Sequence, residues 1–227
     1  MRTKQLILSA ICLFTAANVF AGLSGFLTNQ PNGGLTAGGE TWGSTVELKV
    51  TWIVSQNSDG TWHYQYRFTN WVDELMTMHD VSHFIIEISS GENPFLESDI
   101  LGGIIGDYGD HAIEIFGLSP GNPGFPEGLT IYGLKIDLDD EHTTVEFDST
   151  RSPMWGDFYA KGGGKPKNFA YNSNFGTEAV NKHDYANDPA DATGNSLFKV
   201  LVPNTVPEPT SLLILGFGGL LLVKSRR

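Results

Sequence analysis

Closely spaced carboxylates form the clearest metal-binding pattern in the chain. Asp137, Asp139 and Glu141 occupy the first, third and fifth positions of a calcium-loop spacing, and Asp148 occupies the twelfth. The sixth position, which needs glycine for a sharp turn, is His142, and the flanking segments have strand patterns, so an EF-hand is excluded. Carboxylates two residues apart in a strand share one face. Two interpretations stay open: a looser calcium site at this turn, or an acidic turn solvated by water.

Two histidines have the spacing of a zinc-protease helix. His79 and His83 stand four residues apart, with Asp80 where such a motif carries glutamate. They share a face only if the segment is helical, whereas residues 81–88 favour a strand. We therefore expect a loop histidine and a strand histidine, with no zinc. Apart from calcium, we expect no cofactor.

The tryptophans bear on sugar binding, because an exposed aromatic ring on a β-sheet can stack on a sugar ring. Trp52 and Trp62 alternate in phase with the apolar positions of their strands, which predicts that both lie in the core. Trp42 and Trp71 lie at strand ends or in loops. They are the candidate ligand-binding residues.

No catalytic motif is present. The serine-hydrolase pattern Gly-x-Ser-x-Gly does not occur. A carboxylate pair for glycoside cleavage cannot be selected from 26 Asp and Glu residues without knowledge of the fold. We therefore expect no catalytic residues and a non-enzymatic protein, with a secreted hydrolase that lacks a recognisable motif as an alternative.

The segments that must position these residues have the patterns of β-strands. Residues 46–54 and 62–68 alternate apolar and polar positions around an Asp-Gly turn, which predicts an antiparallel hairpin. We expect a second hairpin from residues 129–138 and 143–147. Residues 26–42 are expected to be irregular. Further strands are expected at 84–88, 112–116, 155–160, 169–171 and 196–202, and a loop with one helical turn at 93–110.

Short strands separated by Gly/Pro turns, without an amphipathic helix, predict an all-β fold. We expect a single antiparallel β-sandwich, jelly-roll-like, over residues 22–202. The net charge of −12 argues against nucleic acid as a partner. The single cysteine, Cys12, lies before this domain, so the domain has no disulfide bonds.

The N-terminus has the pattern of a signal peptide over residues 1–21. Arg2 and Lys4 precede an apolar stretch at residues 6–20, and Val19-Phe20-Ala21 has the small residues of a cleavage site. Signal peptidase is therefore an expected partner, with cleavage after Ala21.

The C-terminus, residues 203–227, is expected to be a linker and a sorting tail. Pro207-Glu208-Pro209 precedes an apolar run that ends at Lys224, Arg226 and Arg227. Residues 210–223 are fewer than the ~20 that span a bilayer comfortably. Such a short helix suits a temporary anchor, with its basic end in the cytoplasm. A plain C-terminal anchor is the alternative.

The triplet, apolar run and basic stop resemble the C-terminal tail of PEP-CTERM exported bacterial proteins. The resemblance implies insertion of the tail in the inner membrane and recognition of Pro207, Glu208 and Pro209 by an exosortase-type membrane enzyme. It also implies cleavage near the triplet and transfer to the cell surface or extracellular matrix. It says nothing about the activity of residues 22–202.

Together these features predict an exported cell-surface or extracellular-matrix protein with a structural or adhesive role. A carbohydrate-binding module, assisted by calcium, is the first alternative, and extracellular polysaccharide is then the expected partner.

Overall fold

The computed structural model describes residues 22–43, 47–70, 81–107, 109, 111–138 and 143–205. These residues form an all-β structure of antiparallel sheets, consistent with a β-sandwich. The predicted signal peptide with Ala21, the triplet Pro207-Glu208-Pro209 and the predicted C-terminal helix lie outside them, as do Trp71, Asp139 and Glu141. No helix in the described part of the chain is long and apolar enough to span a membrane.

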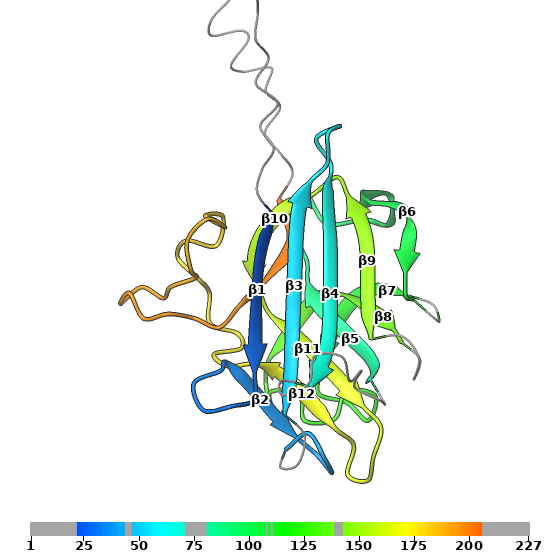
Figure 1. The fold of residues 1–227 in the computed structure, drawn as a ribbon, viewed down its shortest axis with the longest axis vertical. Helices are drawn as coiled ribbons and strands as arrows, with labels where there is room; N and C mark the ends of the chain where they lie inside the picture. The colour runs from blue at the N-terminus through cyan, green and yellow to red at the C-terminus, as the bar shows by residue number, and fades with distance from the viewer. Residues whose placement is uncertain are drawn as a thin grey trace, which may run out of the picture.

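A five-stranded sheet forms one layer, in the order β1-β3-β4-β9-β6 (Figure 1). Its strands are β1 (Leu23–Thr28), β3 (Leu48–Gln56), β4 (Trp62–Asn70), β9 (Thr144–Ser149) and β6 (Ile100–Ile105). One 3-10 turn, Glu97–Asp99, precedes β6.

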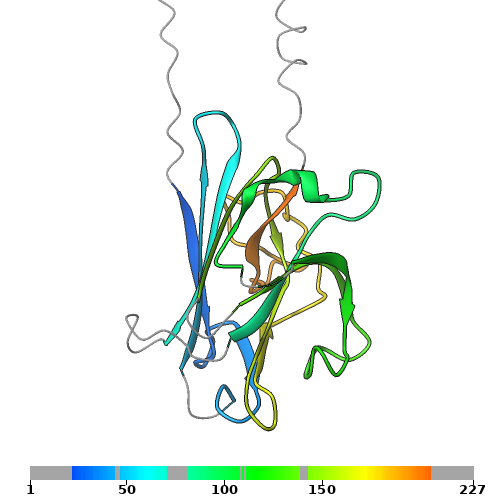
Figure 2. The same cartoon turned by 90° about the vertical axis from the view of Figure 1, so that its right-hand side faces the viewer.

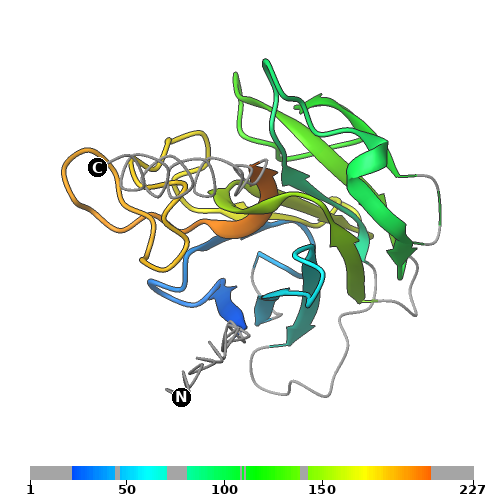
Figure 3. The ribbon, with the colours of Figure 1, turned by 90° about the horizontal axis from the view of Figure 1, so that it is seen from above.

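A six-stranded sheet forms the facing layer, in the order β2-β12-β11-β5-β8-β7 (Figures 2 and 3). Its strands are β2 (Leu35–Gly38), β12 (Phe169–Asn172), β11 (Phe158–Gly162), β5 (Val81–Glu87), β8 (Thr130–Asp137) and β7 (Ala112–Gly117). A separate two-stranded ribbon joins β10 (Ser152–Gly156) to β13 (Val200–Thr205). β13 thus continues past Val202 into the segment expected to be a linker, and Pro203 pairs with Pro153.

The first hairpin is confirmed. β3 and β4 pair over nine registered positions from Leu48↔Asn70 to Gln56↔Trp62. Their apolar residues alternate toward the other sheet, and both Trp52 and Trp62 are buried, as their phase predicts.

The second predicted hairpin is wrong. β8 pairs with β5 and β7, whereas β9 pairs with β4 and β6, so the two strands lie in different sheets. The alternating pattern reports which face of a strand is buried, and both strands do bury one face. It does not report the strand's partner.

Three other segments differ from their predicted structure. The stretch 26–42 is not irregular throughout, because it contains the end of β1 and the whole of β2. The loop predicted at 93–110 contains β6, whose Gly102 and Gly103 both have positive φ and hide the strand pattern. The single strand predicted at 155–160 is two strands, β10 and β11, that separate at Asp157 and belong to different sheets.

The described residues form two apolar cores. The larger core lies between the sheets and includes Phe68 and Val145 from the five-stranded sheet and Phe84 and Leu134 from the six-stranded sheet. A smaller core lies on the other side of the six-stranded sheet. It consists of Ile85, Phe116, Phe125, Ile131, Tyr159 and Phe175.

Candidate functional site

Two hollows lie on either side of Trp155, beneath the long connection of residues 173–199 that joins β12 to β13. We call them the polar hollow, of about 250 Å³, and the aromatic hollow, of about 240 Å³. Trp155 and Lys199 line both. Long connections without regular structure are often functional in compact domains, so these two hollows are the main candidates for a functional site.

Trp155 anchors this connection to the sandwich. Its indole Nε1 donates hydrogen bonds to the carbonyl oxygens of Asp184 (3.2 Å) and Asn187 (2.9 Å). Its backbone N–H donates to the carbonyl of Lys182 (2.9 Å). The connection is therefore held at three points by one residue of β10, and both hollows depend on that residue.

The polar hollow contains a buried ion pair between Asp157 and Lys199, each 4% exposed. The Asp157 carboxylate also accepts hydrogen bonds from Asn172 Nδ2 (2.7 Å) and the Gly176 N–H (2.9 Å). Burial of a charge is tolerated only when it is paired and hydrogen-bonded. Both carboxylate oxygens are thus engaged, and they join the β10–β11 junction to β12 and to both ends of the connection.

Glu87 lies beside this pair. Burial raises the pKa of the Glu87 carboxyl, and the neighbouring Asp157 charge raises it further. Its Oε2 accepts a hydrogen bond from the Asp157 backbone N–H (2.8 Å). A carboxyl with a raised pKa beside a second carboxylate is a pattern seen in acid–base catalysis, but here the second carboxylate is occupied by Lys199, Asn172 and Gly176.

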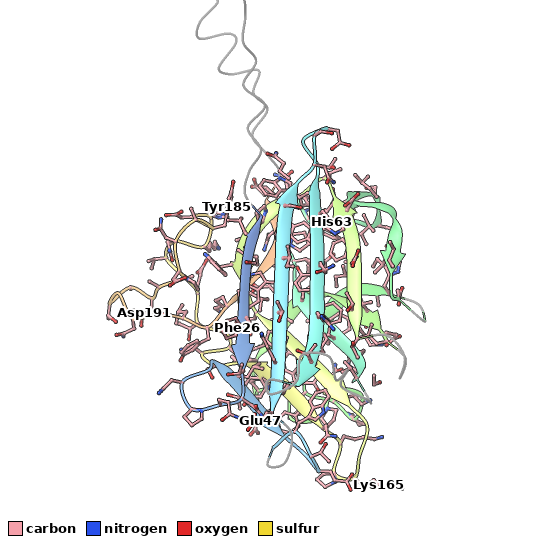
Figure 4. The ribbon with its side chains drawn as sticks, viewed as in Figure 1. Phe26, Glu47, His63, Lys165, Tyr185 and Asp191 are labelled. Carbon is pink, nitrogen blue, oxygen red and sulfur yellow. The ribbon has the colours of Figure 1, made fainter. Side chains whose placement is uncertain are left out.

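The aromatic hollow has a different lining. Phe26, Trp52, Trp155 and Phe198 surround it, and its polar residues include Ser24, Asp188 and Ser196. Phe26 is 51% exposed, and Figure 4 shows it on β1 near the connection that carries Tyr185 and Asp191. Trp52 and Trp155 meet edge to face, with ring centroids 6.3 Å apart and planes at 88°. Aromatic carbon and a few polar groups are typical of small-molecule sites.

The Trp52 indole Nε1 is buried and has no hydrogen-bond partner among the described residues. A buried donor left without an acceptor costs about 1–3 kcal/mol. Gly25, which also lines the hollow, lies against the edge of this ring: a Cβ on Gly25 would stand 2.7 Å from Cε2, the atom bonded to Nε1. Gly25 therefore packs against the benzene edge of the Trp52 ring, and only glycine at position 25 allows this approach.

The sequence candidates for ligand binding are not the residues found here. Trp42 is 1% exposed, and its backbone N–H donates to Asn168 Oδ1 (3.2 Å). The prediction that Trp42 presents a surface ring is wrong, because residues far along the chain cover it. The sequence did not indicate Phe26, Trp155 or Phe198 as ligand-binding residues. The one available signal was for Phe26, an aromatic residue at a position where the alternation of β1 predicts an exposed side chain.

The calcium prediction remains a prediction. Asp137 on β8 forms an ion pair with Lys135 (2.6 Å), and Asp148 on β9 accepts from His63 Nδ1 (2.8 Å), so these two carboxylates belong to different sheets. The described residues contain no group of three or more His, Cys, Asp or Glu side chains that could hold a metal ion.

His83 is a strand histidine, as expected. It lies on β5, is buried, and its Nε2 contacts Asn122 Oδ1 at 3.0 Å. Burial lowers its pKa to about 4, and Lys135 contributes, so the ring is neutral at pH 7.

No protein-family model, curated protein or solved structure matches this chain.

Proposed function

We propose that the β domain is a binding module for neutral polysaccharide, and that the aromatic hollow is its binding site. The observation that carries this proposal is a hollow lined by four aromatic side chains, one of which, Phe26, is 51% exposed. A sugar offers an apolar C–H face that packs on aromatic carbon, and hydroxyl groups that can hydrogen-bond to the polar lining residues.

The size and charge of the hollow support a neutral ligand. Its volume of about 240 Å³ is below the roughly 300–1,000 Å³ of drug-sized sites, which suits one sugar unit of a longer chain. Asp188 lines it, and the one lysine, Lys199, is already paired with Asp157. The described lining residues offer an anionic group no free cation, and the Lys49 ammonium, which lies 4.7 Å from the centroid of the Phe26 ring, is not among them.

Binding to neutral oligosaccharides tests the proposal. We expect the full chain to bind at least one of cellotetraose, xylotetraose and laminaritetraose in isothermal titration calorimetry. Phe26→Ala is expected to weaken binding about tenfold, because loss of ~1.4 kcal/mol of stacking at an exposed rim is a tenfold change.

Ile53→Ala is the matched control for Phe26→Ala. Ile53 is an exposed apolar residue on the neighbouring strand that does not line the hollow, so its loss should leave the affinity unchanged. Equal weakening by Ile53→Ala and Phe26→Ala, or binding to none of the three sugars, would contradict the assignment of this site.

The export and sorting features belong to the same proposal. We propose that residues 1–21 direct export, and that the C-terminal tail anchors the chain transiently before an exosortase-type enzyme acts at Pro207-Glu208-Pro209. The module would then act in adhesion at the cell surface or in the matrix, as a single jelly-roll-like domain. A non-enzymatic role is favoured because Asp157, the carboxylate beside Glu87, is fully engaged in structural contacts.

The intact mass of the protein isolated from its own cells tests the processing steps. We expect a mass that corresponds to a chain from Gly22 to a residue near Pro207. A mass that corresponds to a chain ending at Arg227 would show that the tail is kept as a plain anchor. A mass that corresponds to a chain beginning at Met1 would exclude cleavage after Ala21.

A further inference from the structure

A third hollow lies on the outer face of the six-stranded sheet and has a lining of charged and polar groups. Its volume is about 360 Å³, and it shares no lining residue with the polar or aromatic hollow. We call it the outer hollow. Its lining consists of Ser82, His83, Glu114, Phe116, Gly121, Asn122, Lys135, Asp137 and Lys161.

Strand register explains why these side chains gather. Lys161 on β11 pairs with His83 on β5, and His83 pairs with Asp137 on β8. Directly paired residues in antiparallel strands place their side chains on the same face. Lys161, His83 and Asp137 therefore form a row across three adjacent strands, and this row is built by the sheet rather than by a loop.

Lys161 is the unusual charge in this row. The described residues supply no carboxylate within ion-pair distance of its ammonium group. Burial lowers the pKa of Lys161, and the nearby ammonium groups of Lys167 and Lys135 lower it further. Lys135, by contrast, is paired with Asp137. A lysine that has no ion pair among the described residues and shares a hollow with Lys135 is unexpected in a chain with a net charge of −12.

His83 supplies a second unused group. Asn122 Nδ2 donates to the carbonyl of Gly117 (3.3 Å), which fixes Asn122 Oδ1 as the atom facing His83 Nε2. An amide oxygen can only accept, so His83 Nε2 carries the proton and Nδ1 is an acceptor. Nδ1 has no partner within the described part of the chain, and it can accept from a hydroxyl group.

We propose that the outer hollow binds a sugar residue that carries one negative charge, such as a uronic acid within a polysaccharide. The Lys161 ammonium receives the anionic group. His83 Nδ1 and the carboxylates of Asp137 and Glu114 accept from sugar hydroxyls, and the exposed Ser82 hydroxyl can donate to a ring or hydroxyl oxygen.

The same lining argues against a dianion and against a bare ion. Glu114 and Asp137 repel a second negative charge, so a phosphate group would bind poorly where a carboxylate binds well. Several acceptors in the lining of one hollow match a ligand with several hydroxyl groups. This inference is independent of the proposed aromatic site, because the two sites have no residue in common.

Titration calorimetry on the full chain tests the inference with three probes: trigalacturonate, galactose 6-sulfate and the uncharged galactotriose. We expect trigalacturonate to bind, and galactotriose to bind at least tenfold more weakly or not at all at this site. Galactose 6-sulfate shows whether a sulfate monoanion replaces the carboxylate. Lys161→Gln should weaken trigalacturonate at least tenfold, Lys161→Arg should restore most of the affinity, and added salt should weaken binding.

Lys165→Gln is the matched control, because it removes the same charge from an exposed lysine outside the hollow. It should leave the affinity within twofold. If Lys161→Gln and Lys165→Gln weaken trigalacturonate binding equally, the attraction is nonspecific and the proposed site is overturned. Equal affinity for trigalacturonate and galactotriose would also overturn it, as would the absence of binding of either charged probe. Phe26→Ala separates this inference from the aromatic site, because it should not change trigalacturonate affinity.

Discussion

Replacing Asp157 by alanine is expected to lower the free energy of unfolding by about 3–5 kcal/mol. The change leaves the Lys199 ammonium buried without its counter-charge and removes the acceptor of Asn172 Nδ2 and the Gly176 N–H. Most of this loss of stability comes from leaving a buried charge without its partner. Urea unfolding followed by tryptophan fluorescence measures it.

Two variants show whether burial of the charge is the cause. Glu178→Ala breaks the exposed pair with Lys182 and is expected to change stability by no more than about 0.5 kcal/mol. The double variant Asp157→Asn with Lys199→Met is expected to be more stable than Asp157→Ala, because it leaves no unpaired charge in the interior. Similar small effects of Asp157→Ala and Glu178→Ala on stability would mean that the Asp157–Lys199 ion pair is solvated and does not fix the connection to the sandwich.

Replacing Trp42 by alanine is expected to cost a similar amount, about 3–5 kcal/mol. Trp42 is among the largest fully buried side chains, so its truncation removes a large apolar contact area and leaves a cavity. The same urea titration reports it, and Trp42→Phe should lose less because part of the volume remains.

Saccharide binding by the folded Trp42→Ala protein should be measured together with its stability. Trp42 lines neither the aromatic nor the outer hollow, so the affinity of the folded fraction should be unchanged. A stability loss below about 1 kcal/mol together with lost binding would restore the surface role that the sequence suggested and contradict the buried placement.

The alternation of apolar residues predicted individual strands well. β3, β4, β7 and β12 appear near their expected positions, and Trp52 and Trp62 are buried as their phase requires. This succeeds because the two-residue period of a strand is a local property that one buried face imposes on the sequence.

Pairing and tertiary cover could not be predicted in the same way. The segments now seen as β8 and β9 have the pattern of a hairpin, but each finds its partners in a different sheet. Trp42 lies in a sequence typical of a loop, yet it is covered through contacts such as that with Asn168, more than a hundred residues away. Such contacts depend on the whole fold, and no local period encodes them.

The two proposed sites were equally beyond local pattern. The packing of Trp52 depends on Gly25 of the neighbouring strand, and the row of Lys161, His83 and Asp137 exists only because three distant strands pair in one register. Residue types alone had suggested the acidic turn at Asp137 as a metal site, and did not indicate that Lys135 pairs with it.

The position of the chain ends has a geometric consequence. β1 begins and β13 ends at the same pole of the sandwich (Figures 1 and 2). Leu23 lies two positions after Ala21, and only Val206 separates Thr205 from Pro207. One residue spans at most about 3.6 Å, so very little chain separates the folded domain from the cleavage points that we propose after Ala21 and near Pro207. An exosortase-type enzyme acting at the triplet, as we propose, would therefore have to work beside the folded sheet or separate β13 from β10, and the turn between β11 and β12 lies at the opposite pole (Figure 1).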